Sequence, residues 1–184
     1  DMFDGFETKT VETSGATIHL KMGGNGPPVL LLHGYPQTHV MWHKVAPGLA
    51  QHFTVVEPDL RGYGDSAKPE GGGNHEAYSK RQMAADQVAL MHGLGFEAFA
   101  VAAHDRGARV AHRMALDHPS AVTRLALLDI APTLKMYGDT DQGFATDYYH
   151  WFFLIQPAPF PETLIGADPA FFLRHKTAKF SNAP

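Results

Sequence analysis

The feature that most restricts the fold of this chain is a sharp turn between a predicted strand and a predicted helix. The turn reads Ala103-His104-Asp105-Arg106-Gly107, after an apolar segment at 97–102 and before a helix-forming segment at 108–118. Small residues two positions before and after a central residue are typical of a nucleophile elbow, which lifts the central side chain out of the sheet. Because that residue is a carboxylate, the pattern predicts displacement at saturated carbon with an ester intermediate.

Short apolar runs alternate with segments of helical periodicity through the first two thirds of the chain. An antiparallel hairpin is expected over residues 11–22. The runs that predict strands covered on both faces span residues 29–32, 53–56, 99–103 and 125–128. The alternation predicts an α/β fold, with a mostly parallel sheet and helices on both of its faces.

The helices expected in this first part are one at 41–50, one that begins at Ser79 and whose exit Gly93 and Gly95 mark, and one at 108–118. Ser79 and Gln82 form a capping-box pattern at the start of the second of them. After Pro132 the alternation ends, and helices are expected at 144–155, which is rich in aromatic residues, and from Pro169 to Lys179. We therefore divide the chain into residues 1–131, a core, and residues 132–184, the first part of a helical lid.

The composition argues against several classes of protein. The 184 residues contain no cysteine, so neither a disulfide framework nor a thiolate metal site is expected. The net charge of −4, with both signs interspersed, lacks the basic stripe of a nucleic-acid-binding protein. Since the first residues do not resemble a signal peptide and no run approaches a membrane span, we expect a cytoplasmic protein that binds neither nucleic acid nor membrane. The 12 histidines are scattered without metal-type spacing, and no metal is expected.

Three motifs follow one another along the chain: His33-Gly34-Tyr35-Pro36, Asp59-Leu60-Arg61-Gly62-Tyr63-Gly64-Asp65-Ser66 and His104-Asp105-Arg106-Gly107. With them the chain resembles the α/β-hydrolase superfamily, in its dehalogenase and epoxide-hydrolase branch. Further segments resemble the fluoroacetate (haloacetate) dehalogenases; they are Arg106 with Arg109, residues 112–119, residues 129–133, His150-Trp151 and residues 156–159. The resemblance covers nearly the whole chain. It implies hydrolysis of a haloacetate to glycolate and halide through an aspartyl ester, without a cofactor.

Asp105 is implied as the nucleophile, and Asp129 as the acid that orients a catalytic histidine. Each has a simpler alternative, because aspartates before helices and after strands are often caps. The elbow and the upstream His33-Gly34 favour the nucleophile at Asp105. The resemblance also implies an oxyanion hole made by the backbone N–H groups of Tyr35 and Arg106.

Arg106 and Arg109 are implied as a clamp for the substrate carboxylate. They lie at positions i and i+3 of the expected helix and share one face, although such a pair can also be two solvated surface residues. An anionic substrate ~4 Å from an ionised aspartate is repelled by about 4 kcal/mol in a protein-like dielectric, which corresponds to a rate factor of several hundred. Two fixed cations offset that repulsion. Relatives that act on neutral alkyl halides or epoxides resemble this chain but usually carry an aromatic residue at the position of Arg106.

His150 and Trp151 resemble a halide pocket, since imidazole and indole each supply an N–H donor. The alternative is that this aromatic helix only packs the lid. Arg113 shares the helical face of Arg106 and Arg109, and we expect it to be a structural ion-pair partner. We expect the side chains of His33 and His104 to satisfy backbone groups.

The resemblance places the catalytic histidine beyond Pro184, so a C-terminal segment that is missing or separate is expected, and a homodimer is left open. This chain alone should then stall as an ester on Asp105 after about one halide per molecule. Two other readings remain. One is an epoxide hydrolase, with Tyr148 and Tyr149 as candidate acids; the other is a catalytically incomplete half-domain, in which the strand at 125–128 exposes an apolar edge.

Overall fold

A computed structural model describes residues 2–178 of the chain. They form two compact units, with the boundary between Ile130 and Ala131. The first unit contains every strand of the described residues, and the second contains only helices. Among residues 2–178, no helix has both the length and the apolar character needed to cross a membrane.

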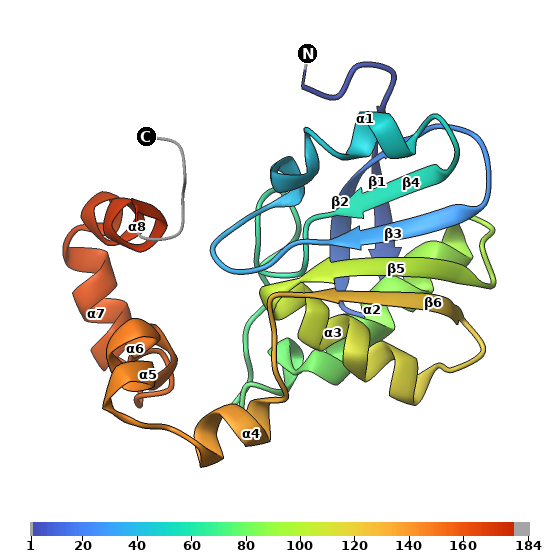
Figure 1. The fold of residues 1–184 in the computed structure, drawn as a ribbon. Coiled ribbons are helices and arrows are strands. Elements are labelled where there is room, and N and C mark those ends of the chain that lie inside the picture. Colours follow the sequence, from blue (N-terminus) through green and yellow to red (C-terminus); the bar gives the residue numbers. More distant parts are fainter. Residues whose placement is uncertain (1, 179–184) are drawn as a thin grey trace. The chain divides into compact units, whose positions relative to one another are not determined.

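The first unit is built on a six-stranded sheet with the order β1-β2-β4-β3-β5-β6 (Figure 1). The strands are β1 (Glu7–Thr13), β2 (Ala16–Gly23), β3 (Pro28–Leu32), β4 (Thr54–Pro58), β5 (Phe99–His104) and β6 (Val122–Leu128). β1 and β2 form an antiparallel hairpin, and β2 pairs antiparallel with β4. The remaining pairs, β3 with β4, β3 with β5 and β5 with β6, are parallel. The predicted hairpin and mostly parallel sheet are confirmed.

Helices cover both faces of this sheet (Figure 1). The helical elements of the unit are η1 (His39–Trp42), α1 (Ala46–Leu49), η2 (Glu76–Tyr78), α2 (Lys80–Gly93) and α3 (Asp105–Asp117). α2 and α3 pack on one face around a core that includes Leu30, Val101 and Met114. η1 and α1 cover the other face, where Trp42 and Leu31 are buried. Alternate residues of the strands therefore enter different cores, as expected for strands covered twice.

The helix predicted to begin at Ser79 begins as expected, because the Ser79 side chain accepts a hydrogen bond from the Gln82 N–H at 3.1 Å. The prediction of one continuous helix at 41–50 is wrong, because η1 and α1 are two separate short elements. Pro47 in the first turn of α1 cannot donate to a preceding turn, which favours a new start there. α3 begins at Asp105, three residues earlier than the predicted 108.

The second unit contains α4 (Thr133–Gly138), α5 (Gln142–Asp147), α6 (Tyr149–Phe153), α7 (Phe160–Ala167) and α8 (Pro169–Ala178). The helix predicted at 144–155 is interrupted at Tyr148, whose backbone (φ −110°, ψ 33°) is not helical. Its rings still pack on one another, as Phe144 stacks on Tyr148 with centroids 4.9 Å apart. The final predicted helix is confirmed up to residue 178; Lys179 lies outside the described residues.

β6 is the outer strand of the sheet, on the side away from the hairpin. The side chains of Leu125, Leu127 and Leu128 are exposed there. This is the apolar edge that the sequence predicts for residues 125–128, and such an edge is a surface on which another strand or chain can pair.

Candidate active site

Asp105 stands at the junction of β5 and α3, in a backbone conformation that L-residues rarely adopt (φ 45°). Close packing around the junction explains this bend. A methyl group on Gly107 would lie 2.3 Å from the His33 carbonyl oxygen, so only glycine lets α3 begin this close to the end of β3. A non-glycine residue held at positive φ costs about 1–3 kcal/mol and is often found at functional sites. The geometry is that of the predicted elbow.

The backbone of the loop after β3 contacts the Asp105 carboxylate directly. The Tyr35 N–H donates to Asp105 Oδ1 at 2.8 Å. A Cβ on Gly34 would lie 2.7 Å from the same oxygen, so the loop approaches it as closely as glycine allows. The Arg106 guanidinium lies over the Tyr35 ring, 5.1 Å from its centroid. Tyr35, Asp105 and Arg106 are thus brought together by two motifs that are 70 residues apart.

His33 holds this loop from inside. Its Nε2 accepts from the Leu60 N–H at 3.0 Å, so the ring proton is on Nδ1, which donates to the Gly34 carbonyl at 2.9 Å. Burial lowers the pKa of His33, although the hydrogen bond to Gly34 opposes that shift. A neutral imidazole therefore satisfies two backbone groups, as the sequence predicts for His33.

The side chain of His104 has a different role from the one expected, because its partners are side chains. Its Nδ1 lies 3.1 Å from Gln37 Oε1, which also accepts from the Gly34 N–H at 3.2 Å. Its Nε2 lies 3.6 Å from Asp129 Oδ2. His104 thereby links the loop after β3 to Asp129, which follows β6 with a left-handed backbone (φ 56°). The prediction that His104 satisfies backbone groups is wrong, since side-chain partners from two other segments are in reach.

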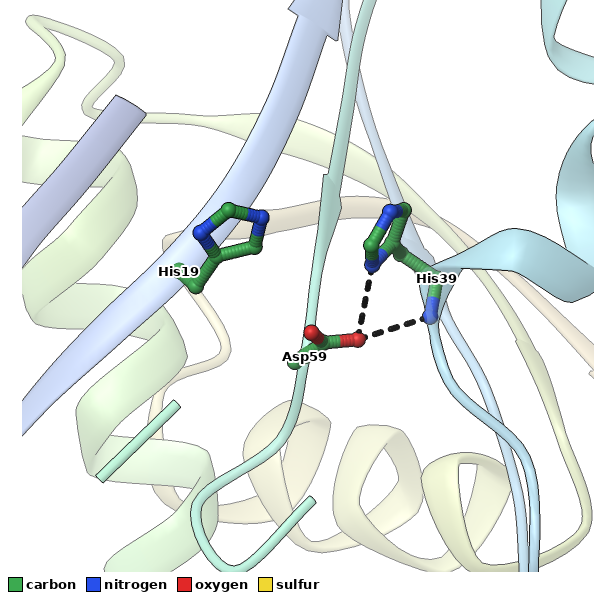
Figure 2. Close-up of side chains that lie close together, drawn as sticks. All are labelled: His19, His39 and Asp59. Atoms are coloured by element: carbon green, nitrogen blue, oxygen red, sulfur yellow. Dashed lines mark hydrogen bonds and ion pairs between the residues drawn. The ribbon is translucent and has the colours of Figure 1, made fainter. Parts of the chain in front are cut away.

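The same loop is anchored at its far end by a cluster of His19, His39 and Asp59 (Figure 2). Asp59 Oδ1 accepts from both the N–H and the Nδ1 of His39, each at 2.8 Å, and Oδ2 accepts from the Asp65 N–H at 3.0 Å. Burial alone would raise the pKa of Asp59, but these hydrogen bonds outweigh it and lower the pKa to about 2.

One possible ligand atom from each of the three residues lies within 4.8 Å of the others, which is a spacing that a metal ion could use. The Asp59 carboxylate is already engaged by three N–H donors, and a metal would have to displace some of them. We therefore interpret the cluster as an anchor that fixes η1, and with it the loop that carries Tyr35.

Lys80 and Tyr63, which the sequence does not predict as site residues, also interact with this region. The charges of Arg106, Arg109 and Asp105 all act on Lys80, the first residue of α2. Burial, and then the two arginines, lower the pKa of Lys80 to about 8, against the opposing charge of Asp105. Three cationic side chains and one carboxylate therefore interact in this region, which gives it a positive balance suited to an anionic ligand.

Tyr63 is the second of these residues. Burial raises the pKa of its hydroxyl, while Arg106 opposes and Asp105 and Tyr35 reinforce that shift. Its ring contacts that of His33, with centroids 5.1 Å apart. The signal for Tyr63 is its place in the glycine-rich motif at 59–66, but nothing in that motif shows which of its side chains interacts with the charge of Asp105.

Arg113 lies further along α3 and pairs with Asp117, one turn away. Asp117 also accepts from Arg81 of α2 at 2.9 Å. The two arginines thus join α2 to α3 through one carboxylate, so the structural ion pair predicted for Arg113 is confirmed.

The predicted halide ligands lie in α6 of the second unit. His150 is buried, and Trp151 is half-buried with its ring 5.4 Å from that of Tyr137. Asp105, Asp129, Tyr35, Arg106 and Arg109 all lie in the first unit.

A family model described as the alpha/beta hydrolase fold matches residues 27–179. The chain is 56% identical over 171 residues to a fluoroacetate dehalogenase from Burkholderia sp, and 40% identical over 162 residues to a soluble epoxide hydrolase from Corynebacterium sp. (strain C12). These matches take in 93% and 88% of this chain but only 56% and 55% of the two relatives, so the chain spans just over half of their length.

Among solved structures, a provisionally assigned alpha/beta hydrolase from Nostoc sp PCC 7120 matches with a TM-score of 0.92 and 65% identity. That match covers 95% of this chain and 60% of the Nostoc chain. The epoxide hydrolase CorEH matches with a TM-score of 0.84 and 37% identity, over 92% of this chain and 59% of the other.

Proposed function

Since this chain belongs to the α/β-hydrolase family, we propose that its protein hydrolyses haloacetates, fluoroacetate among them, to glycolate and halide through an ester on Asp105. The observation that carries the proposal is the surroundings of the Asp105 carboxylate. One oxygen accepts the Tyr35 N–H at 2.8 Å, and the positive charges of Arg106 and Arg109 lie in the same region as Asp105, where all three act on Lys80. The 56% identity to a fluoroacetate dehalogenase agrees with this chemistry.

In the first step Asp105 Oδ2 attacks carbon 2 of the haloacetate. A carbon–oxygen bond forms, the carbon–halogen bond breaks, and the halide leaves with the bonding electron pair. Oδ1 is the oxygen held by the Tyr35 N–H, which leaves Oδ2 as the attacking atom. His150 and Trp151 are the proposed donors to the departing halide, where N–H groups replace the water that a small anion otherwise needs.

Arg106 and Arg109 hold the substrate carboxylate during this attack. The substrate and Asp105 carry like charges, and each cation reduces the cost of bringing them together. Lys80 contributes a further positive charge to the same region below about pH 8. A neutral substrate gains nothing from this arrangement, which is why the proposal names an anionic haloacid.

In the second step water attacks the ester carbonyl of Asp105. The developing oxyanion is Oδ1, which already accepts the Tyr35 N–H, so the donor is in place before the charge forms. The Arg106 N–H at the start of α3 is the proposed second donor. Asp129 is proposed to orient the histidine that activates the water, a residue expected in the part of the relatives that this chain does not span.

The test uses the intact natural polypeptide in a single turnover with fluoroacetate in ¹⁸O-labelled water. Hydrolysis at the ester carbonyl places one label in the carboxylate of Asp105, which mass spectrometry of the peptide detects. Asp105→Asn should release no fluoride, whereas Asp4→Asn, at an exposed site, should behave as the unchanged protein. Fluoride release with the label only in glycolate would refute the aspartyl ester.

Epoxide hydrolysis is the second candidate, because the chain is 40% identical to a soluble epoxide hydrolase. It uses the same nucleophile but needs an acid for the epoxide oxygen, for which Tyr148 and Tyr149 of the second unit are the proposed groups. Diol formed from styrene oxide, without halide released from fluoroacetate, would favour it. The paired arginines favour the dehalogenase, since an epoxide carries no anion for them to hold.

A further inference from the structure

A buried lysine in α8 contacts the proposed halide donor in α6. Lys176 is only 5% exposed, and its Nζ lies 2.7 Å from the Nδ1 of His150, which is itself 6% exposed. Lysine is among the residue types that are almost never fully buried without a partner. Both residues belong to the second unit, so this contact is internal to it.

The contact determines where the imidazole proton is held. An alkylammonium has an ordinary pKa of about 10.4 and an imidazolium of about 6.5, so a proton shared between them resides on the lysine. The ammonium has three donors and no acceptor, which makes Nδ1 of His150 the acceptor. A neutral imidazole that accepts at Nδ1 carries its hydrogen on Nε2. Adding a second proton would place two cations within hydrogen-bond distance, which burial penalises strongly.

We propose that Lys176 is a positioning residue for halide release, which rests on the function proposed above. It holds His150 as the Nε2–H tautomer, with the donor directed away from α8, and it places a positive charge behind that donor. As the carbon–fluorine bond breaks, negative charge grows on fluorine; the Nε2–H then donates to it, and the Nδ1 contact with the ammonium strengthens this donor. Fluoride, the strongest hydrogen-bond acceptor among the halides, depends on such a donor most.

The alternative is that Lys176 serves only to pack α8 against α6. Three substitutions separate the two roles. Lys176→Met removes both donor and charge at similar length, Lys176→Gln keeps an N–H donor without the charge, and Lys176→Arg keeps both. Lys135→Met is the matched control, because Lys135 is an exposed lysine of α4 that pairs with Asp139.

Halide release from fluoroacetate and from bromoacetate is measured with the intact natural polypeptide. Lys176→Met should lower kcat for fluoroacetate by about 100-fold, the usual effect of losing one transition-state donor, because nothing then keeps the His150 hydrogen on Nε2; kcat for bromoacetate should fall by less than about tenfold. Lys176→Gln should fall between, Lys176→Arg should recover most of the activity, and Lys135→Met should match the unchanged protein. Equal losses on both substrates, or full defluorination by Lys176→Met, would overturn the proposal.

The ring ¹⁵N shifts of His150 in the unchanged protein provide a readout that does not depend on activity or on the folding of any variant. A protonated Nε2 and an unprotonated Nδ1 are expected, and the reverse assignment would overturn the proposal. If the unchanged protein released no halide, the proposed function would fall, and with it the role in halide release; the ¹⁵N spectrum would still decide whether Lys176 fixes the ring.

Discussion

Glu57 offers the sharpest test of how this fold is held together, because it is a carboxyl group buried in β4. It is completely buried, and among residues 2–178 neither of its side-chain oxygens has a hydrogen-bond partner. Burial raises the pKa of Glu57 from 4.5 to about 8, although the Lys21 charge on the neighbouring strand opposes that shift. The folded protein therefore keeps Glu57 neutral at pH 7, while the unfolded chain releases the proton.

The sign of the pH dependence follows directly. Between about pH 4.5 and pH 8 the folded state holds a proton that the unfolded state has lost, so stability falls as pH rises through this range. Each pKa unit is worth about 1.4 kcal/mol, and pH 7 lies about 2.5 units above the ordinary value. The penalty at pH 7 is therefore up to about 3 kcal/mol, and it saturates near pH 8.

Glu57→Gln replaces the group with a neutral side chain of the same shape and removes the penalty. We expect the free energy of unfolding to rise by about 1–3 kcal/mol at pH 7 and to change little at pH 4. The assay is urea unfolding followed by tryptophan fluorescence from pH 4 to pH 9. Glu70→Gln, at an exposed position, is the control. A difference between Glu57→Gln and the unchanged protein that stays constant across this pH range would refute the reasoning.

Three further predictions concern the proposed site. Gly34→Ala should lower fluoride release by at least about 100-fold, because the new methyl would displace the Asp105 carboxylate; Gly48→Ala, with open space around its Cβ, should not. Arg109→Met should raise KM for chloroacetate by about 10- to 100-fold and leave the reaction with neutral chloroacetamide unchanged, and equal effects on both would contradict the clamp. KM for the anionic substrate should rise as Lys80 loses its proton near pH 8, and initial rates should show that Lys80→Met removes this rise. Lys80→Met should also raise the free energy of unfolding at pH 7, because burial disfavours the charged lysine; urea unfolding measures this change.

The sequence was a good guide wherever a local pattern decides the structure. Alternation and turn residues predicted the hairpin and the four parallel strands, and Ser79 predicted the start of α2. The predicted helices were wrong where a proline or the backbone angles of a single residue decide where a helix begins or ends. The sequence patterns predict no helix between 155 and 169, yet α7 forms there, with Pro161 in its first turn, where no N–H donor is needed. The non-helical backbone of Tyr148 leaves no mark in the periodicity of 144–155.

The same distinction applies to the proposed site, where local motifs located residues but not the contacts between them. A motif known to bend the chain located Asp105, and a second motif located Tyr35. The contacts that hold them require the tertiary fold: Gln37 reaches His104, and His104 reaches Asp129, from segments with no local relationship. Lys80 did leave a signal, because a cation in the first turn of a helix opposes the helix dipole. A cation at a position that the helix itself disfavours is therefore a candidate for a role outside the helix.

That reasoning applies to the whole chain. Asp105 takes a left-handed backbone, Lys80 carries a charge that its surroundings disfavour, and Lys176 is a buried lysine. Each choice costs stability, and all three residues belong to the proposed chemistry as nucleophile, cation and support of the halide donor. Glu57 also costs stability, as a buried carboxyl group, but it has no role in the proposed chemistry. Its replacement should therefore raise stability without loss of activity. Stabilisation by Glu57→Gln that also reduced halide release would mean that the site extends to the interior of β4.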